Sequence, residues 1–215
     1  MRDKYQHVFW DWNGTLLDDA WLCVDVLNQL LARRNLPLIT LKNYIETFSF
    51  PAIDYYRRLG FDTLKDSFES LSLEYINIYN LRRQECDLHT GVLEMVDSFM
   101  KQNIHQSILS AYRKDYLIEA LEIFKLKEYF LHISGLDNIY ANSKLENGIR
   151  LLKNVEENPV HILMIGDTQH DYEVACGMGV DCILLAHGHN HYEILQRCGC
   201  KVFKTMDYLK KFLGI

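Results

Sequence analysis

The chain of 215 residues is 48% hydrophobic and 24% charged, which suffices for a sizeable core in one domain or one domain with an insertion. Its formal net charge is −6 and the basic residues are scattered along the chain, which excludes the basic face that a nucleic-acid-binding protein needs. An acidic surface repels anionic substrates at long range, so a phosphate site would need local cations.

The N-terminal segment is charged and too poor in apolar residues for a signal peptide, and no apolar run reaches the roughly 18–20 residues of a membrane span. We therefore expect a cytoplasmic protein with no membrane partner. The six cysteines show no small-domain disulfide pattern, and in a reducing compartment they would be thiols.

Short apolar runs alternate with segments of helical periodicity along most of the chain. Such alternation is typical of a parallel sheet that is covered by helices on both faces. The sequence therefore predicts an α/β fold, a doubly wound, Rossmann-like parallel sheet. The expected strands cover residues 7–10, 106–110, 129–134, 160–166, 182–186 and 201–204, and two of the expected helices cover 91–102 and 114–124.

One long stretch, residues 16–88, breaks this alternation. It contains no convincing strand and is punctuated by Pro37, Pro51 and Gly60. We interpret it as a helical cap domain inserted after the first strand of a core domain made of 1–15 and 89–215. Its expected helices cover 16–34, 40–48, 52–60 and 62–83.

Polar side chains follow three of the expected strands. Asp11 follows the first, Ser110 ends the second and Asp167 follows 160–166. Ligands of an open parallel sheet bind outside the carboxyl ends of its strands, so these three side chains are expected at one edge. Each alone would also suit a turn or a helix cap.

Asp171 adds a second carboxylate four residues after Asp167. Near a helix N-terminus both acids would serve as capping residues. Together with Asp11 they would repel one another unless a cation lay among them. Such an oxygen-rich cluster suits Mg²⁺, which takes few protein ligands.

Four segments resemble the motifs of the haloacid dehalogenase superfamily, in its phosphoglycolate-phosphatase-like branch. The segment DWNGT at 11–15 is similar to the family's D-x-D-G-T, and GDTQHD at 166–171 matches G-D-[ST]-x-x-D in full. Ser110 closes a strand and Lys144 precedes the last motif, as in that family. The resemblance covers nearly the whole core, and residues 16–88 correspond to the family's mobile cap.

The resemblance implies a stepwise phosphoryl transfer to and from Asp11. The catalytic residues would be Asp11, Asn13 and Lys144, and Mg²⁺ would be held by Asp11, the backbone carbonyl of Asn13 and Asp167, with Asp171 close by. The phosphorylated substrate, a small metabolite, would be bound by Trp12, Thr15, Ser110, Ala111 and Lys144. Backbone N–H groups of the 12–15 turn would add to this anion site.

Asn13 departs from the family pattern, which has a second Asp at this position. That Asp protonates the leaving group and later activates water, and an amide can do neither. General acid–base assistance is typically worth about 10²–10⁴-fold in rate. The metal site would survive this change, because it uses the backbone carbonyl of residue 13.

Four interpretations remain open. The first is a phosphatase whose leaving group departs easily or takes its proton from water or a cap residue. The second is a C–P bond hydrolase like the phosphonoacetaldehyde hydrolases, which have D-W-A-G-T and need a cap lysine, here Lys42 or Lys65. The third is a dehalogenase, against which the complete acidic pair argues, and the fourth is a non-enzymatic phosphate-ligand or protein-binding module.

Further features admit two interpretations each. The clusters His187/His189/His191 and Cys198/Cys200 could bind a soft metal, but their spacing is not typical of zinc sites; His189 could instead approach the phosphate site. The arginines Arg57, Arg58, Arg82 and Arg83 could bind an acidic substrate tail, or lie solvated at helix ends. The insert's aromatic residues could form the core of the cap or stack on the substrate; they are Tyr44, Phe48, Phe50, Tyr55, Tyr56 and Phe61. Nothing in the sequence indicates an oligomeric state.

Overall fold

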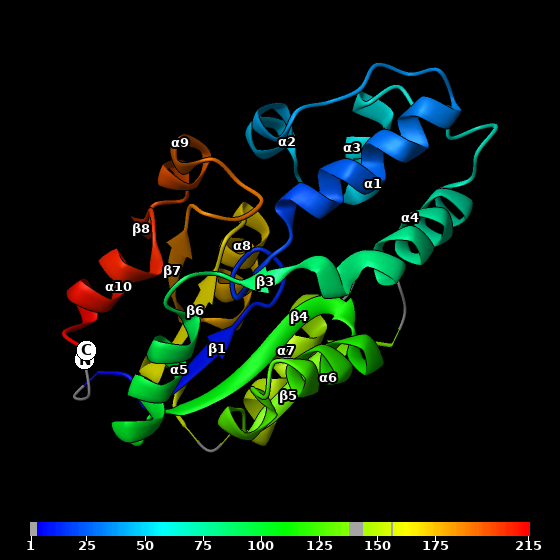
Figure 1. The fold of residues 1–215 in the computed structure, drawn as a ribbon. Helices are drawn as coiled ribbons and strands as arrows, with labels where there is room; N and C mark the ends of the chain where they lie inside the picture. Colours follow the sequence, from blue (N-terminus) through cyan, green and yellow to red (C-terminus); the bar gives the residue numbers. More distant parts are fainter. Residues whose placement is uncertain (1–3, 138–143, 156) are drawn as a thin grey trace.

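Six strands form one parallel sheet in the order β5-β4-β1-β6-β7-β8 (Figure 1). The structure is a computed structural model that describes residues 4–137, 144–155 and 157–215. The strands are β1 (His7–Trp10), β4 (His105–Arg113), β5 (His132–Leu136), β6 (Ile162–Gly166), β7 (Asp181–Leu185) and β8 (Lys201–Phe203). The predicted α/β fold with a doubly wound parallel sheet is confirmed.

Helices cover both faces of this sheet. On one face, Phe9, Leu109 and Met164 pack against the apolar sides of two helices, α7 and α8. The opposite face, with Val8, Trp10 and Ile165, belongs to a larger core. That core also contains the apolar sides of the helices α5, α6 and α10. These helices are α5 (Val92–Lys101), α6 (Lys114–Ile123), α7 (Lys144–Asn154), α8 (Gln169–Met178) and α10 (Met206–Leu213), and the short α9 (Tyr192–Leu195) follows β7.

The centre of the sheet holds its topological switch point. The chain leaves β1 for β4 on one side, and after β5 it returns to β6 on the other side. Trp10, the last residue of β1, lies level with Ile108 in β4 and Ile165 in β6. Connections diverge at such a point and leave a crevice at the carboxyl ends of the strands. Asp11, Ser110 and Asp167 each come one or two residues after Trp10, Ile108 and Ile165, so they lie at this edge of the sheet, as predicted.

The segment 16–88 is mainly helical, but the expectation that it holds no strand was wrong. Leu17–Asp18 (β2) pairs antiparallel with Asp87–Leu88 (β3), so a short ribbon joins the two ends of the segment. A two-residue strand is too short to give a periodic pattern in the sequence. The helices of the segment 16–88 lie together beyond the carboxyl ends of the parallel strands (Figure 1). They are α1 (Ala20–Arg33), α2 (Leu41–Thr47), α3 (Ala52–Arg58) and α4 (Phe68–Arg82).

Other differences from the predicted bounds arise at the ends of elements. Strand β4 continues to Arg113, so Ser110 lies inside the strand and not at its end; pairing with β5 is irregular between Leu109 and Arg113. Helix α4 begins at Phe68 because Ser67 caps it, accepting a hydrogen bond from Ser70 N. Residues 127–129 and 159–161 form 3₁₀ turns that shorten the strands expected there.

Among the described residues, no helix has the length and apolarity to span a membrane.

Candidate active site

Asp11 lies at the centre of the crevice, directly after β1. Its backbone N–H donates to Ile165 O at 2.9 Å, which continues the ladder between β1 and β6 and fixes where the side chain leaves the sheet. The side chain is only 9% exposed, and it lines a cavity between the sheet and the helices of 16–88. Burial raises the pKa of Asp11 to about 6, against the opposing effect of Lys144.

Lys144, the first residue of α7, joins two of the predicted carboxylates. Its Nζ donates to Asp11 Oδ1 and, at 2.5 Å, to Asp171 Oδ1. The ammonium group is buried, and although burial favours its neutral form, the two carboxylates raise the pKa of Lys144 above its usual value. The other oxygen of Asp171 caps α8, since Oδ2 accepts from Thr168 N at 2.9 Å and from Thr168 Oγ1 at 2.7 Å. Asp171 therefore serves both the helix cap and the lysine.

Asp167 is fully buried beneath the cavity and is held by two donors. Thr15 Oγ1 donates to its Oδ1 at 2.8 Å, and the backbone N–H of His189 donates to its Oδ2 at 2.7 Å. Two glycines allow this close packing, because a Cβ on Gly14 or Gly188 would lie 2.2 Å from Asp167 Oδ2. Burial raises the pKa of Asp167 to about 8.

The donor set of this cluster fits a divalent cation. Oxygen atoms of Asp11, Asp167 and Asp171 lie within 4.8 Å of one another. Buried carboxylates repel one another and lose hydration, and Lys144 pairs with only two of the three. A hard cation such as Mg²⁺ prefers carboxylate and carbonyl oxygens and would offset this cost.

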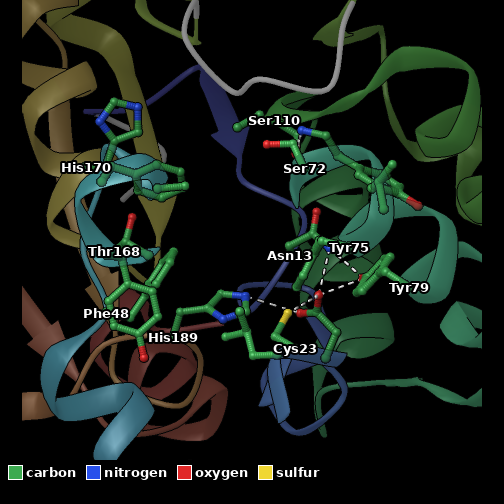
Figure 2. A pocket seen from close by; sticks show the side chains of 18 of the residues that line it. Asn13, Cys23, Phe48, Ser72, Tyr75, Tyr79, Ser110, Thr168, His170 and His189 are labelled. Carbon is green, nitrogen blue, oxygen red and sulfur yellow. Dashed lines mark hydrogen bonds and ion pairs between the residues drawn. The ribbon is translucent and has the colours of Figure 1, made fainter. Parts of the chain in front are cut away.

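The side-chain amide of Asn13 is hydrogen-bonded to the carboxylate of Asp19, a residue that was not predicted from the sequence to belong to the site. Asn13 Nδ2 donates to Asp19 Oδ2 at 2.8 Å and to Tyr79 OH at 2.9 Å. Tyr79 OH in turn donates to Asp19 Oδ2 at 2.7 Å, and Gly14 N donates to Asp19 Oδ1 at 2.8 Å. Figure 2 shows this network below the cavity, between Asn13 and Tyr79. Asp19 lies shortly after the DWNGT motif in the sequence, but this position alone does not identify its partners.

His189 completes the network from the loop after β7. Its Nε2 lies 3.3 Å from Asp19 Oδ1, and its Nδ1 lies 3.0 Å from Tyr44 OH. Burial alone would lower the pKa of His189, but the carboxylate of Asp19 outweighs burial and raises it to about 9. Asp19 therefore favours the charged form of His189, which lines the cavity, as one of the alternatives expected.

The cavity between the sheet and α1–α4 has a volume of about 200 Å³ and two unlike ends. The end at the sheet is polar and contains Asp11, Asn13, Ser110, Ala111, Lys144 and Asp171. The opposite end is aromatic. Aromatic residues around the cavity are Tyr44, Phe48, Phe50, Tyr55, Tyr56, Phe68, Tyr75, Tyr79 and Tyr112. In Figure 2, Phe48, Thr168, His170 and His189 face Ser72, Tyr75 and Tyr79 across the open space.

Of three further residues predicted to bind substrate, one side chain lines the cavity and two do not. Ser110 lies in the cavity wall, where its Oγ accepts from Tyr112 N at 3.1 Å. Thr15 lies beneath the cavity with its hydroxyl on Asp167. The side chain of Trp12 is turned away toward Phe124, so only its backbone remains available to an anion.

The histidine and cysteine clusters of 187–200 do not gather at one metal site. His187 stacks on His89 with ring centroids 3.8 Å apart, whereas His191 caps α9 and accepts from Glu193 N. Cys200 lies elsewhere, near Cys176 and Cys182. In the described part of the chain, no group of potential metal ligands includes Cys198 or Cys200.

Comparison with known proteins identifies a family for this chain. The model of the haloacid dehalogenase-like hydrolase family matches residues 8–185. Phosphoglycolate phosphatase of Pseudomonas savastanoi pv. phaseolicola is 22% identical over 86% of this chain and 70% of its own length. N-acetylmuramic acid 6-phosphate phosphatase of Pseudomonas putida is 24% identical over 88% of this chain and 86% of its own length.

Solved structures of other proteins have the same fold. Protein tyrosine kinase A of Mycobacterium tuberculosis superposes with a TM-score of 0.81 at 19% identity, covering 99% of this chain and 100% of the other. At this identity the likeness shows the fold alone. The family match, with the four motifs gathered at one end of the sheet, establishes that the chain belongs to the haloacid dehalogenase-like hydrolases, as the resemblance implied.

Proposed function

We propose that the protein is a Mg²⁺-dependent phosphatase that hydrolyses a small phosphorylated metabolite through an aspartyl-phosphate at Asp11. One observation carries the proposal. Asp11 faces the cavity at the switch point of the sheet, with Lys144 bonded to it and Asp167 beside it. The names of the two phosphatase relatives agree with this activity. A cytoplasmic location remains a prediction from the sequence.

In the first step, an oxygen of Asp11 attacks phosphorus in line with the ester oxygen. The bond between Asp11 and phosphorus forms while the bond to the organic group breaks, and its electron pair stays on the leaving oxygen. Water then attacks the same phosphorus, which releases inorganic phosphate and regenerates the Asp11 carboxylate. A phosphoryl group carries its charge on oxygen throughout, so positioned cations and donors account for most of the catalysis.

The residues of this chain have distinct parts in these steps. Lys144 lies close enough to Asp11 to contact a phosphoryl group attached there, and Ser110 and the backbone of Ala111 line the same wall. Asp171 is a positioning residue, because it holds Lys144 at Nζ. Asp11, the Asn13 carbonyl and Asp167 would hold Mg²⁺, which would supply positive charge to the transferring group.

The proton that the leaving group needs has no carboxylic acid at residue 13 to supply it. The Asn13 amide is bonded to Asp19 and Tyr79, and an amide does not titrate in this range. We propose that water, or a residue lining the cavity, supplies this proton, and that a leaving group of low pKa needs it least.

The alternative of C–P bond cleavage is disfavoured by the positions of the two cap lysines. The side chains of Lys42 and Lys65 are 80% and 85% exposed, and they lie near Glu46 and Asp62 on the surface. Neither lines the cavity, so neither can form a Schiff base with a substrate bound next to Asp11.

Turnover of p-nitrophenyl phosphate in the presence of Mg²⁺ tests the proposal, since p-nitrophenolate leaves without protonation. We expect phosphate release that EDTA stops, that excess Mg²⁺ restores and that Asp11→Asn abolishes. Asp207→Asn, which makes the same change at an exposed position in α10, is the matched control and should leave turnover unchanged. A parent protein that binds phosphate but does not turn over the ester would favour the non-enzymatic binding module.

A further inference from the structure

The cavity that receives the leaving group is walled by aromatic rings. Phe48 stacks on Tyr44 with ring centroids 4.9 Å apart and meets Tyr55 edge to face at 5.3 Å. Phe50 lies 4.8 Å from the ring of His170, so the wall continues from the cap onto the core. Both interpretations of the aromatic residues therefore hold in part: they pack on one another, and all except Phe61 line the cavity.

Hydrogen bonds join the cap to the core beside the aromatic wall. Asn190 Nδ2 donates to Phe48 O at 3.0 Å, and His191 N donates to Ile45 O at 2.9 Å. Tyr44 OH is paired with His189. An organic group attached to a phosphoryl group at Asp11 would thus lie against these rings, between cap and core.

Residues 16–88 contribute no cation to the cavity. Every basic residue of this segment lies outside the lining: Arg33, Arg34, Lys42, Arg57, Arg58, Lys65, Arg82 and Arg83. They are committed elsewhere, as Arg34 is to Glu74 and Asp66, and Arg83 is to Glu119. Arg58, which lies beside Tyr55, donates to Thr47 O and to Ser49 Oγ. No arginine of this segment lines the cavity, so none is placed to bind an acidic substrate tail there.

The charged side chains that do line the cavity are also paired with one another. Lys144 is bonded to Asp11 and Asp171, and His189 is bonded to Asp19. A second anion on the substrate would therefore lie among rings and near carboxylates. His170 also lines the cavity, and its buried Nε2 has no hydrogen-bond partner, but burial lowers the pKa of His170 and so disfavours its charged form. Burying an unpaired carboxylate costs several kcal/mol.

The volume limits the size of the organic group. A cavity of about 150 Å³ with an apolar lining accommodates one benzene molecule, and the cavity here is about 200 Å³. It therefore has room for a group of about one ring beside the phosphoryl group. Apolar contact with the aromatic wall would stabilise such a ring in proportion to the area it buries.

We infer that the substrate is a phosphomonoester whose organic part carries no negative charge and presents a ring-sized apolar face to the wall formed by Phe48, Tyr55 and Tyr75. This inference rests on the proposed phosphatase function and narrows it. It distinguishes this chain's substrate from phosphoglycolate, whose carboxylate is the kind of group that the cavity leaves unpaired.

The test compares kcat/KM for benzyl phosphate and 4-carboxybenzyl phosphate, which differ by one carboxylate far from the leaving oxygen. We expect benzyl phosphate to be favoured by roughly 100-fold, the discrimination produced by one unpaired buried charge. Equal values, or a preference for the carboxylated ester, would overturn the inference and leave the phosphatase function intact. Absence of turnover with both esters and with p-nitrophenyl phosphate would instead overturn the proposed function.

Ethyl phosphate tests the ring separately from the charge. Because it cannot contact the aromatic wall, its kcat/KM should be at least about tenfold below that of benzyl phosphate. An equal or higher value for ethyl phosphate would contradict recognition of a ring.

A variant of Ser72 provides a gain of specificity. Ser72 is buried in α4 and lines the cavity, whereas Ser70 is exposed on the same helix. Ser72→Lys should raise the ratio of kcat/KM for 4-carboxybenzyl over benzyl phosphate by about tenfold, because it places a cation beside the added carboxylate. Ser70→Lys adds the same charge outside and should leave the ratio unchanged; equal ratios in the two variants would count against the inference. If thermal unfolding shows that Ser72→Lys does not fold, the ratio of kcat/KM for benzyl over 4-carboxybenzyl phosphate in the parent protein still tests the inference.

Discussion

The side-chain amide of Asn13 lies 2.8 Å from a carboxylate oxygen of Asp19, and the two are joined by a hydrogen bond. Asp19 is fully buried and also accepts from Tyr79 OH and Gly14 N. The position that holds an acid in most phosphatases of this family therefore faces an acid here. Installing that acid is not a simple restoration of the usual site.

Asn13→Asp should consequently destabilise the protein without improving catalysis. Two carboxylates at this distance cannot both ionise, and we expect a loss of about 2–4 kcal/mol in the free energy of unfolding. The double variant Asn13→Asp/Asp19→Asn exchanges the two groups and should recover most of that stability. Denaturant unfolding and kcat/KM on benzyl phosphate measure both effects. A single variant as stable as the parent and faster on this ester would contradict the interpretation.

Lys144 should be the most important buried cation for stability in the absence of metal. Lys144→Met removes the group that pairs with Asp11 and Asp171, and we expect unfolding in EDTA to become easier by about 3–5 kcal/mol. Lys153→Met on the exposed side of the same helix is the matched control and should change stability by less than about 0.5 kcal/mol. A small effect of Lys144→Met would mean that the pair of carboxylates is not held ionised by this lysine.

Metal binding should strengthen as the pH rises toward the pKa of Asp167. That pKa is about 8 in the folded chain, above the usual 3.8, so near neutral pH Mg²⁺ must displace a proton from it. The affinity for Mg²⁺, measured by calorimetry, should rise about tenfold per pH unit between about pH 6 and pH 8. Asp167→Asn should remove most of this slope, and an affinity that falls with pH would contradict the assignment.

The metal-free protein should show the opposite trend in stability. For Asp167, a raised pKa means that its contribution to stability is complete below about 4 and is lost as the pH rises through about 8. The same sign holds for His189, whose pKa rises from 6.5 to about 9 because Asp19 outweighs burial. Thermal unfolding in EDTA should therefore show a Tm that decreases from about pH 6 to pH 9. A Tm that increases from pH 6 to pH 9 would contradict the raised pKa values of Asp167 and His189.

Gly188 should be intolerant of a side chain because of Asp167. A Cβ there would lie 2.2 Å from Asp167 Oδ2 and 2.4 Å from Gly14 O, so the carboxylate proposed to hold Mg²⁺ would have to move. We expect Gly188→Ala to lower kcat/KM by at least about tenfold, since misplacement by about 1 Å commonly costs 10²-fold. Gly199→Ala, where the nearest atom is 3.9 Å from the new Cβ, should reduce stability through its positive φ and leave kcat/KM unchanged.

The parallel sheet and the acidic edge could be predicted because they depend on local signals. An apolar run that ends in Asp11 or Gly166 identifies a buried strand and the residue after it. The role of Asp19 could not be predicted in this way, because its partners come from the first motif, α4 and the loop after β7. The β2–β3 ribbon was missed because strands of two residues give no periodic pattern.

The aromatic cavity illustrates a different limit of the sequence. Helical spacing places Tyr44 and Tyr55 on buried faces, and they are buried, but periodicity does not distinguish a packed core from the wall of a cavity. The same holds for the arginines of the segment, whose pairing with surface acids is visible only in three dimensions. The charge of the substrate's organic part therefore had to be inferred from the structure.

Detection of a phosphoryl group on Asp11 tests the central claim most directly. The protein is mixed with p-nitrophenyl phosphate and Mg²⁺, quenched in acid during turnover, digested and analysed by peptide mass spectrometry. We predict one phosphorylated site in the peptide that contains Asp11, lost with hydroxylamine and absent from Asp11→Asn. Turnover without any such modification, or modification that persists in Asp11→Asn, would contradict the account.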